Sequence, residues 1–162
     1  MADQATSSIS TSVFLDEIKS RMNGLCDYTP VDADDKWIFA EVAVGNSSAD
    51  LVATLDYLGT STPTVVADDD VEWIAIKNIS GTATDGIAVR IDAQAAAHNS
   101  AGNMYIGAGE MLVMKCRLTP IGSVHVIPVT MTGASGKPSG THSGTVNCHV
   151  AAILADGGSW YA

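Results

Sequence analysis

Four histidines and three cysteines are the residues of this sequence best suited to bind a transition metal. A zinc site on a helix needs two histidines four positions apart, and a zinc ribbon needs Cys-x-x-Cys pairs. Neither spacing occurs: His98 and His142 fall in expected loops, and His125 and His149 in expected strands. Cys148 adjoins His149, but neighbouring strand residues point to opposite faces. The sequence therefore predicts no metal and no cofactor.

Two acidic clusters could supply the oxygen ligands that calcium prefers. One comprises Asp32, Asp34 and Asp35, and the other is the run Asp68-Asp69-Asp70. Neither follows the Asp-x-Asp-x-Asp-Gly loop with its distal glutamate. We interpret both clusters as polar turns that precede strands, and calcium binding remains the alternative.

Residue patterns for nucleophilic or phosphate chemistry are absent from the sequence. No Gly-x-Ser-x-Gly nucleophile elbow occurs, and no pair of carboxylates stands out as a glycosidase pair. The glycine-rich run 133–140 resembles a phosphate loop, but it reads Gly-Lys-Pro where that loop has Gly-Lys-Ser or Gly-Lys-Thr. Pro138 also lacks the amide that such a loop would donate. We therefore predict that the chain is not an enzyme.

Composition favours a single soluble domain. The chain has 162 residues, of which 18 are acidic and 8 are lysine or arginine, giving a formal net charge of −10. An acidic surface repels phosphate backbones and anionic lipids, so neither nucleic acid nor a membrane is an expected partner. The first residues lack the basic and apolar regions of a secretory signal, and the cysteine count is odd, which together predict synthesis in a reducing host cytoplasm.

Most of the chain shows the two-residue hydrophobic period of β-strands. Expected strands cover residues 37–44, 51–58, 71–78, 87–92, 104–106, 111–118, 124–129 and 146–154. Strands at this spacing, with no helix of useful length between them, are typical of an all-β sandwich. We predict a mainly β fold, an antiparallel β-sandwich of jelly-roll-like or immunoglobulin-like form, with Cys116 and Cys148 as buried free thiols.

The first 25 residues depart from this period. Residues 1–9 are small and polar, which predicts a flexible N-terminal arm before one domain over 10–162. Apolar residues then recur at steps of three and four, which predicts a short amphipathic helix at about 11–23. The apolar positions that carry this pattern are Phe14, Leu15, Ile18, Met22 and Leu25.

Two places carry apolar residues that need a partner surface. The face of the expected helix includes Phe14, Ile18 and Met22, and the chain end carries Trp160 and Tyr161 after two glycines. Large aromatic residues at a chain end gain free energy only when they are packed against something. We select these five residues as candidate oligomer or partner contacts. The segment 130–144, rich in glycine, serine and threonine, is the candidate binding loop.

Residues 70–78, the turn Gly107–Glu110 with the strand after it, and the C-terminal run 150–155 together resemble small β-sandwich virion proteins of tailed bacteriophages. The resemblance extends over about residues 70–155. It implies a capsid decoration, or cement, protein: a small acidic domain, often trimeric, that binds the outer surface of the shell and clamps the joints between major capsid protein subunits.

We therefore expect a virion structural protein on the outer capsid surface that stabilises the shell as a homo-oligomer, most simply a trimer. Bound copies would stabilise the intact shell by mass action. The alternatives are a receptor- or carbohydrate-binding module of a phage tail or fibre, with its site in the loop 130–144, and another tail or connector component.

Overall fold

The structure is a computed structural model of the chain, and it is built from β-strands. It describes residues 5–15, 18–28, 36–53, 55–58, 64, 69–91, 97, 99–100, 102–118, 124–132 and 137–156. For residues 5–15, 18–28, 116–118 and 156 the description is of the backbone alone. No helix occurs among the described residues.

The N-terminal segment forms a long antiparallel hairpin, which we call the arm. Strand β1 (Ala5–Leu15) pairs with β2 (Ile18–Tyr28), from Ala5 opposite Tyr28 to Leu15 opposite Ile18. The arm thus takes in positions 5–9 of the expected flexible segment, and it occupies the positions at which the sequence predicts a helix at about 11–23. The serines, threonines and β-branched residues of β1 are poor helix formers and favour extended backbone.

Nine further strands form the body of the molecule. They are β3 (Lys36–Val44), β4 (Ala49–Asp50), β5 (Asp69–Asn78), β6 (Asp85–Ile91), β7 (Met104–Ile106), β8 (Met111–Leu118), β9 (Val124–Thr132), β10 (Lys137–Thr141) and β11 (Val146–Asp156).

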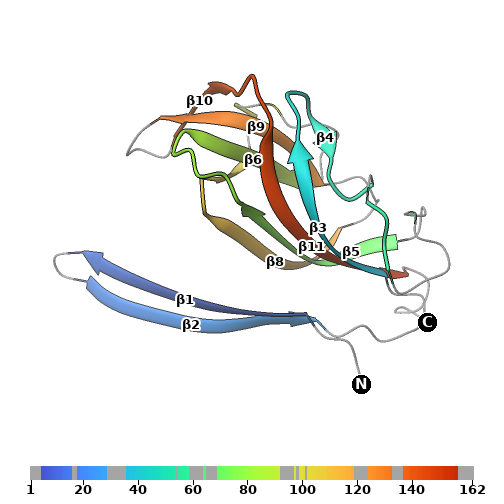
Figure 1. Ribbon diagram of the computed structural model, residues 1–162. Helices are drawn as coiled ribbons and strands as arrows, with labels where there is room; N and C mark the ends of the chain where they lie inside the picture. The colour runs from blue at the N-terminus through green and yellow to red at the C-terminus, as the bar shows by residue number, and fades with distance from the viewer. Residues whose placement is uncertain are drawn as a thin grey trace.

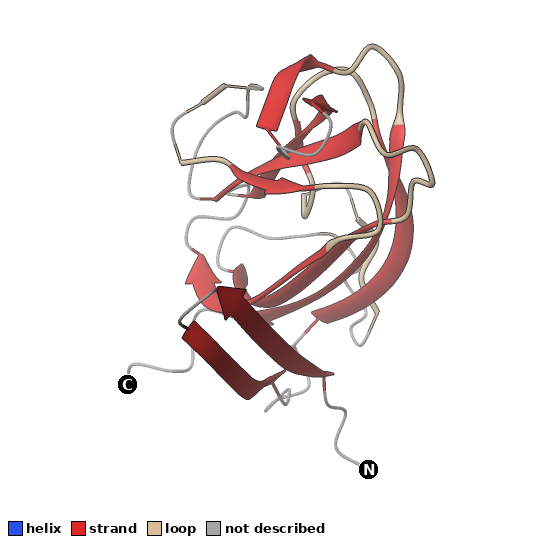
Figure 2. Ribbon diagram, turned by 90° about the vertical axis from the view of Figure 1, so that its left-hand side faces the viewer, coloured by secondary structure: helices blue, strands red, loops and turns tan. Residues whose placement is uncertain are grey.

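The body strands form two antiparallel sheets. One is four-stranded in the order β3-β11-β5-β8, and the other is five-stranded, with β10-β9-β6-β7 in sequence and β4 paired to β9. The two views in Figures 1 and 2 show the four-stranded sheet between the five-stranded sheet and the arm. Two antiparallel sheets are the architecture that the two-residue period predicts.

The larger of two hydrophobic clusters among the described residues lies between the two sheets. The four-stranded sheet contributes buried residues such as Ile74, Ile76 and Val150, and the five-stranded sheet contributes Ile87 and Val126. Even-numbered residues of β3 and β11 point into this core and odd-numbered ones point away from it. This alternation is the strand pattern that the sequence shows, and it buries the thiol of Cys148 as expected.

Two expected elements differ from the structure. Residues 51–58 do not form a strand, because the Asp50 carboxylate accepts hydrogen bonds from the backbone N–H of Val52 (3.1 Å) and of Ala53 (3.4 Å) and turns the chain there. The expected loop 130–144 is largely strand: β9 continues to Thr132, and β10 pairs back onto it.

Candidate functional site

The candidate site is the outer face of the four-stranded sheet, the side that points away from the core. Its central row runs across all four strands, because Phe39 pairs with Ala151, Ala151 with Ala75, and Ala75 with Val113. The small side chains of the two alanines leave the Phe39 ring standing above its neighbours, and 69% of Phe39 is exposed. An aromatic ring beside small residues is a shape that a partner can cover closely.

Exposed apolar side chains concentrate at this sheet. Four large hydrophobic residues are exposed in the described part of the chain. Phe39 and Trp37 lie on β3, Met111 lies on β8, and Leu58 forms an isolated bridge with Trp37 at the β3 edge. Scattered exposed apolar residues need no explanation, but Trp37, Phe39 and Leu58 lie together at the β3 edge, and such a cluster is typical of an interaction surface.

A polar row borders the apolar part of the outer face. It consists of Glu41, His149 and Lys77, which are neighbours through the β3–β11 and β11–β5 pairings. His149 Nε2 lies 4.0 Å from Glu41 Oε2, and the His149 and Phe39 ring centroids are 5.4 Å apart. Asn147 Nδ2 donates to Glu41 Oε1 at 3.1 Å. An apolar centre with a polar border is the usual anatomy of a protein interface.

One part of the outer face is covered. Trp73 and Ile153 occupy outward positions opposite each other on β5 and β11, yet they are only 5% and 4% exposed. Strand β2 of the arm lies next to β5 and β8. The arm therefore lies on the same side of the sheet as Phe39, and the open part of the outer face is the β3 side.

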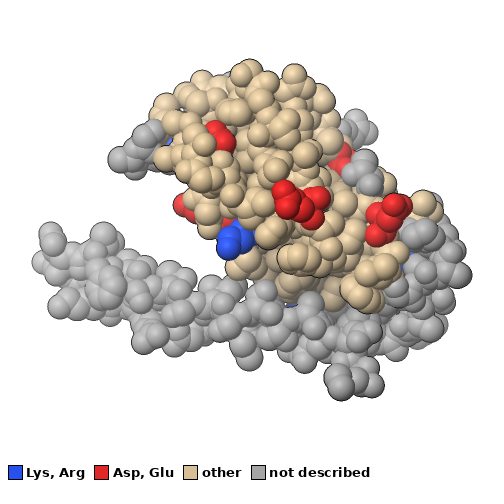
Figure 3. Space-filling model, in the orientation of Figure 1, with Lys and Arg blue, Asp and Glu red and all other residues tan. Residues whose placement is uncertain are grey.

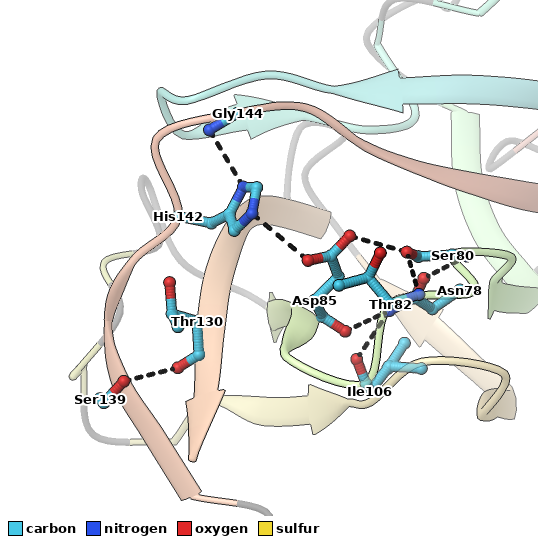
Figure 4. A network of polar contacts seen from close by, with 9 residues as sticks. All are labelled: Asn78, Ser80, Thr82, Asp85, Ile106, Thr130, Ser139, His142 and Gly144. Atoms are coloured by element: carbon cyan, nitrogen blue, oxygen red, sulfur yellow. Dashed lines mark hydrogen bonds and ion pairs between the residues drawn. The ribbon is translucent and has the colours of Figure 1, made fainter. Parts of the chain in front are cut away.

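A serine, an aspartate and a histidine come together elsewhere, between the β5–β6 turn and the segment joining β10 to β11 (Figure 4). Ser80 Oγ donates to Asp85 Oδ2 at 2.7 Å, and His142 Nε2 lies 3.3 Å from Asp85 Oδ1. In a hydrolase triad the histidine lies between the other two groups and takes the serine proton. Here the aspartate lies between them, so His142 is not placed to activate Ser80.

The second nitrogen of His142 is also engaged. Its Nδ1 accepts a hydrogen bond from the Gly144 backbone N–H at 3.0 Å, and Ser80 Oγ accepts from the Thr82 N–H at 3.1 Å. Asn78, which is fully buried, donates from Nδ2 to the Asp85 carbonyl at 3.0 Å. These contacts connect the β5–β6 turn to the segment between β10 and β11. We call the network of Asn78, Ser80, Asp85, His142 and Gly144 the latch, and its role is structural.

The run Asp68-Asp69-Asp70 differs from a calcium loop where it is described. Asp69 and Asp70 are the first residues of β5, and both are 1% exposed. Lys36 Nζ donates to Asp69 Oδ2 at 2.6 Å. Burial raises the pKa of the nearby Tyr57 phenol, and the carboxylates of Asp50 and Asp69 raise it further. Across the described residues, no three His, Cys, Asp or Glu side chains gather as a metal site.

The predicted contact residues fall partly outside the described residues. Trp160 and Tyr161 lie there, as do Asp32, Asp34, Asp35 and His98. Phe14, Ile18 and Met22 belong to the arm, near its turn end. Strand alternation puts Ile18 and Met22 on one face of the arm, whereas Phe14, paired with Lys19, is on the other.

The site on the outer face was not among the predicted contacts. The alternation from Trp37 to Val44 predicts that Trp37 and Phe39 point outward. It does not predict that other segments leave these side chains exposed. A large aromatic at an outward strand position was the signal available.

No family model, no curated protein and no solved structure matches this chain. No helix in the described part is long and apolar enough to cross a membrane.

Proposed function

We propose that this protein is a structural adhesion module of a bacteriophage virion, a capsid decoration protein that binds the major capsid protein from outside and works as a homo-oligomer. The observation that carries the proposal is the 69% exposed Phe39 on the edge strand β3, at the end of a row that continues through Ala151 and Ala75. We also propose that the two sheets form a jelly-roll-like sandwich.

Burial of the exposed face provides a driving force for adhesion. Covering a large aromatic side chain gives about 1.5–3 kcal/mol, and Trp37 and Met111, 37% and 55% exposed, add to it. Many copies bound to one shell would multiply this gain, since each copy stabilises the state to which it binds.

The charge distribution supports an outer location. The chain has a formal net charge of −10, and Figure 3 shows a described surface with scattered acidic groups and little basic area. Such a surface has no attraction for packaged DNA. The latch geometry around His142 also supports a non-enzymatic role, because both of its nitrogens are held by the fold.

Co-sedimentation with DNA-free shells of the encoding phage tests the proposal. We expect the full chain to pellet saturably with shells, and Phe39→Ser to bind at least ten-fold more weakly. Lys137→Ser, an exposed change on β10 of the other sheet, is the matched control and should bind normally. If the wild-type chain does not pellet with shells at any concentration, the decoration role is refuted.

A carbohydrate-binding module of a tail or fibre is the second candidate. The observation in its favour is that Trp37 and Phe39 present two aromatic rings on one face, next to Glu41, Asn147 and His149. Sugars stack on aromatic rings and bond to such polar groups. The segment 130–144, which the sequence predicts to be the binding loop, contains β10 and has no Phe, Trp or Tyr. Saturable binding on a glycan array, lost in Phe39→Ser, would favour this function.

A further inference from the structure

We infer that the arm of one copy packs on the open β3 side of the outer face of a second copy, so that the chains assemble head to tail. This inference rests on the proposed function, since it names the partner of the same surface. In the oligomer the exposed Phe39 then lies in the contact between identical chains, and its loss weakens shell binding because separate copies lose the multivalent attachment of the oligomer.

The arm by itself has too little contact to be stable. Within the described residues β1 pairs only with β2, and the two strands make a separate two-stranded sheet. An isolated hairpin in water is marginally stable at best. The arm therefore needs a surface to pack on along its length.

The arm's own body supplies only part of that surface. Each arm strand has 11 residues and spans about 36 Å, whereas β8 beside it has 8 residues and spans about 27 Å. Figure 1 shows the end of β1 and the start of β2 reaching past β8 to one side of the body. Figure 2 shows the arm in front of and below the two sheets, so the views agree that this end projects.

The sequence of the projecting half suits an apolar surface. The face that contains Ile18 and Met22 also contains Val13 and Leu15, because Leu15 pairs with Ile18 and Val13 with Ser20. Four apolar residues thus lie on one face of the arm, at the end where β1 stops and β2 begins. A hairpin with one such face is stabilised when that face is covered.

The open β3 side of a second copy offers the matching surface. Strand β2 already contacts β5 and β8 of its own body, so the fold uses the contact of a hairpin with the four-stranded sheet once. The projecting half would repeat that contact on the remaining open area around Phe39 in the next chain. Because the donor and acceptor surfaces differ, the contact is heterologous and closes into a ring when the rotation permits, as in a trimer.

Mixed cross-linking of the full chain tests the inference. One preparation carries Ile18→Cys and the other Phe39→Cys, and the two are mixed under mild oxidation. We expect a disulfide-linked product of two chains, one from each preparation. Each variant oxidised with wild-type chain is the control for the native cysteines. If the mixture gives no cross-link between the two preparations, or no more product than the wild-type controls, the inference is overturned.

Light scattering separates failure of this inference from failure of the proposed function. We expect a wild-type oligomer and a monomer for Ile18→Ser/Met22→Ser and for Phe39→Ser, each with an unchanged β-sheet circular dichroism spectrum. A chain that is monomeric as wild type but still binds shells would contradict arm exchange and leave the decoration role standing. An oligomer that does not bind shells would contradict the decoration role and leave the contact between arm and sheet standing.

Discussion

The ammonium nitrogen of Lys36 lies 2.6 Å from a carboxylate oxygen of Asp69, and the two side chains are 5% and 2% exposed. The pair joins the first residue of β3 to the first residue of β5, two strands that are separated by β11 in the sheet. Lys36 Nζ also donates to the Thr64 carbonyl at 3.2 Å. The pair therefore holds the entry points of two strands together inside the protein.

We predict that Lys36→Met destabilises the fold by about 3–5 kcal/mol, because it leaves the Asp69 carboxylate buried without its cation. The double variant Lys36→Met/Asp69→Leu should recover most of the loss, since it removes both charges. Urea unfolding followed by circular dichroism measures both. A single-variant loss below about 1 kcal/mol would show that the pair is hydrated in solution.

Cys148 gives a pH-dependent prediction. Burial raises the pKa of its thiol from 9.0 to about 11, and Glu41 raises it in the same direction. The unfolded chain therefore loses this proton at a lower pH than the folded chain. Stability from this group is complete below pH 9 and falls as the pH rises toward 11.

We expect the free energy of unfolding to fall by about 2–3 kcal/mol across that window through Cys148 alone. Cys148→Ser, which does not titrate there, should show a shallower slope between pH 8.5 and 10. Tyr57 is present in both proteins and adds the same slope to each. Native Cys148 should also react slowly with iodoacetamide at pH 8. Equal slopes for the two proteins would contradict the assignment.

The latch around Asp85 predicts a local effect. Without an acceptor at His142 Nδ1, the Gly144 amide loses its hydrogen bond, and His142→Ala should speed its hydrogen exchange at least ten-fold. The loss in global stability should be about 1–2 kcal/mol. Ser143→Ala, an exposed neighbour in the same segment, is the matched control and should change neither. Unchanged exchange in His142→Ala would show that the latch does not form.

Two glycines give a paired test of packing. A Cβ atom on Gly86 would lie 2.5 Å from Met131 Cγ and 3.0 Å from Val129 Cγ2, whereas a Cβ on Gly81 would meet nothing within 4 Å. Gly86→Ala should therefore destabilise the protein by about 1–3 kcal/mol, and Gly81→Ala by less than about 0.5 kcal/mol. Thermal unfolding compares them. Equal midpoints would mean that Met131 moves aside freely.

The strands were predictable where alternation is continuous. In β6, Ile87, Val89 and Ile91 face the core as expected, and β11 follows its expected bounds to within two residues. The structure of the segment after Asp50 was not predictable, because a hydrogen bond from the backbone to the Asp50 side chain competes there with extended backbone. Strand β10 has the sequence Lys-Pro-Ser-Gly-Thr, which contains no alternating large apolar residues and therefore gives no strand signal.

The candidate site was less predictable than the fold. Alternation places Phe39 outward, but exposure depends on which other segments cover the sheet. The latch joins Ser80 and Asp85 to His142, far along the chain, through pairings of whole strands that no local pattern specifies. Apolar residues at 14, 18 and 22 fit a helical period as well as a hairpin with two unequal faces, so the period alone does not choose between the two.

Hydroxyl-radical footprinting on purified virions tests most directly whether the outer face of the four-stranded sheet is the adhesive surface. We predict that Phe39 and Met111 are oxidised at least five-fold more slowly on the particle than in the monomer obtained by dilution, while Tyr105 on the other sheet reacts equally in both. Equal oxidation of Phe39 in the two samples would contradict the account.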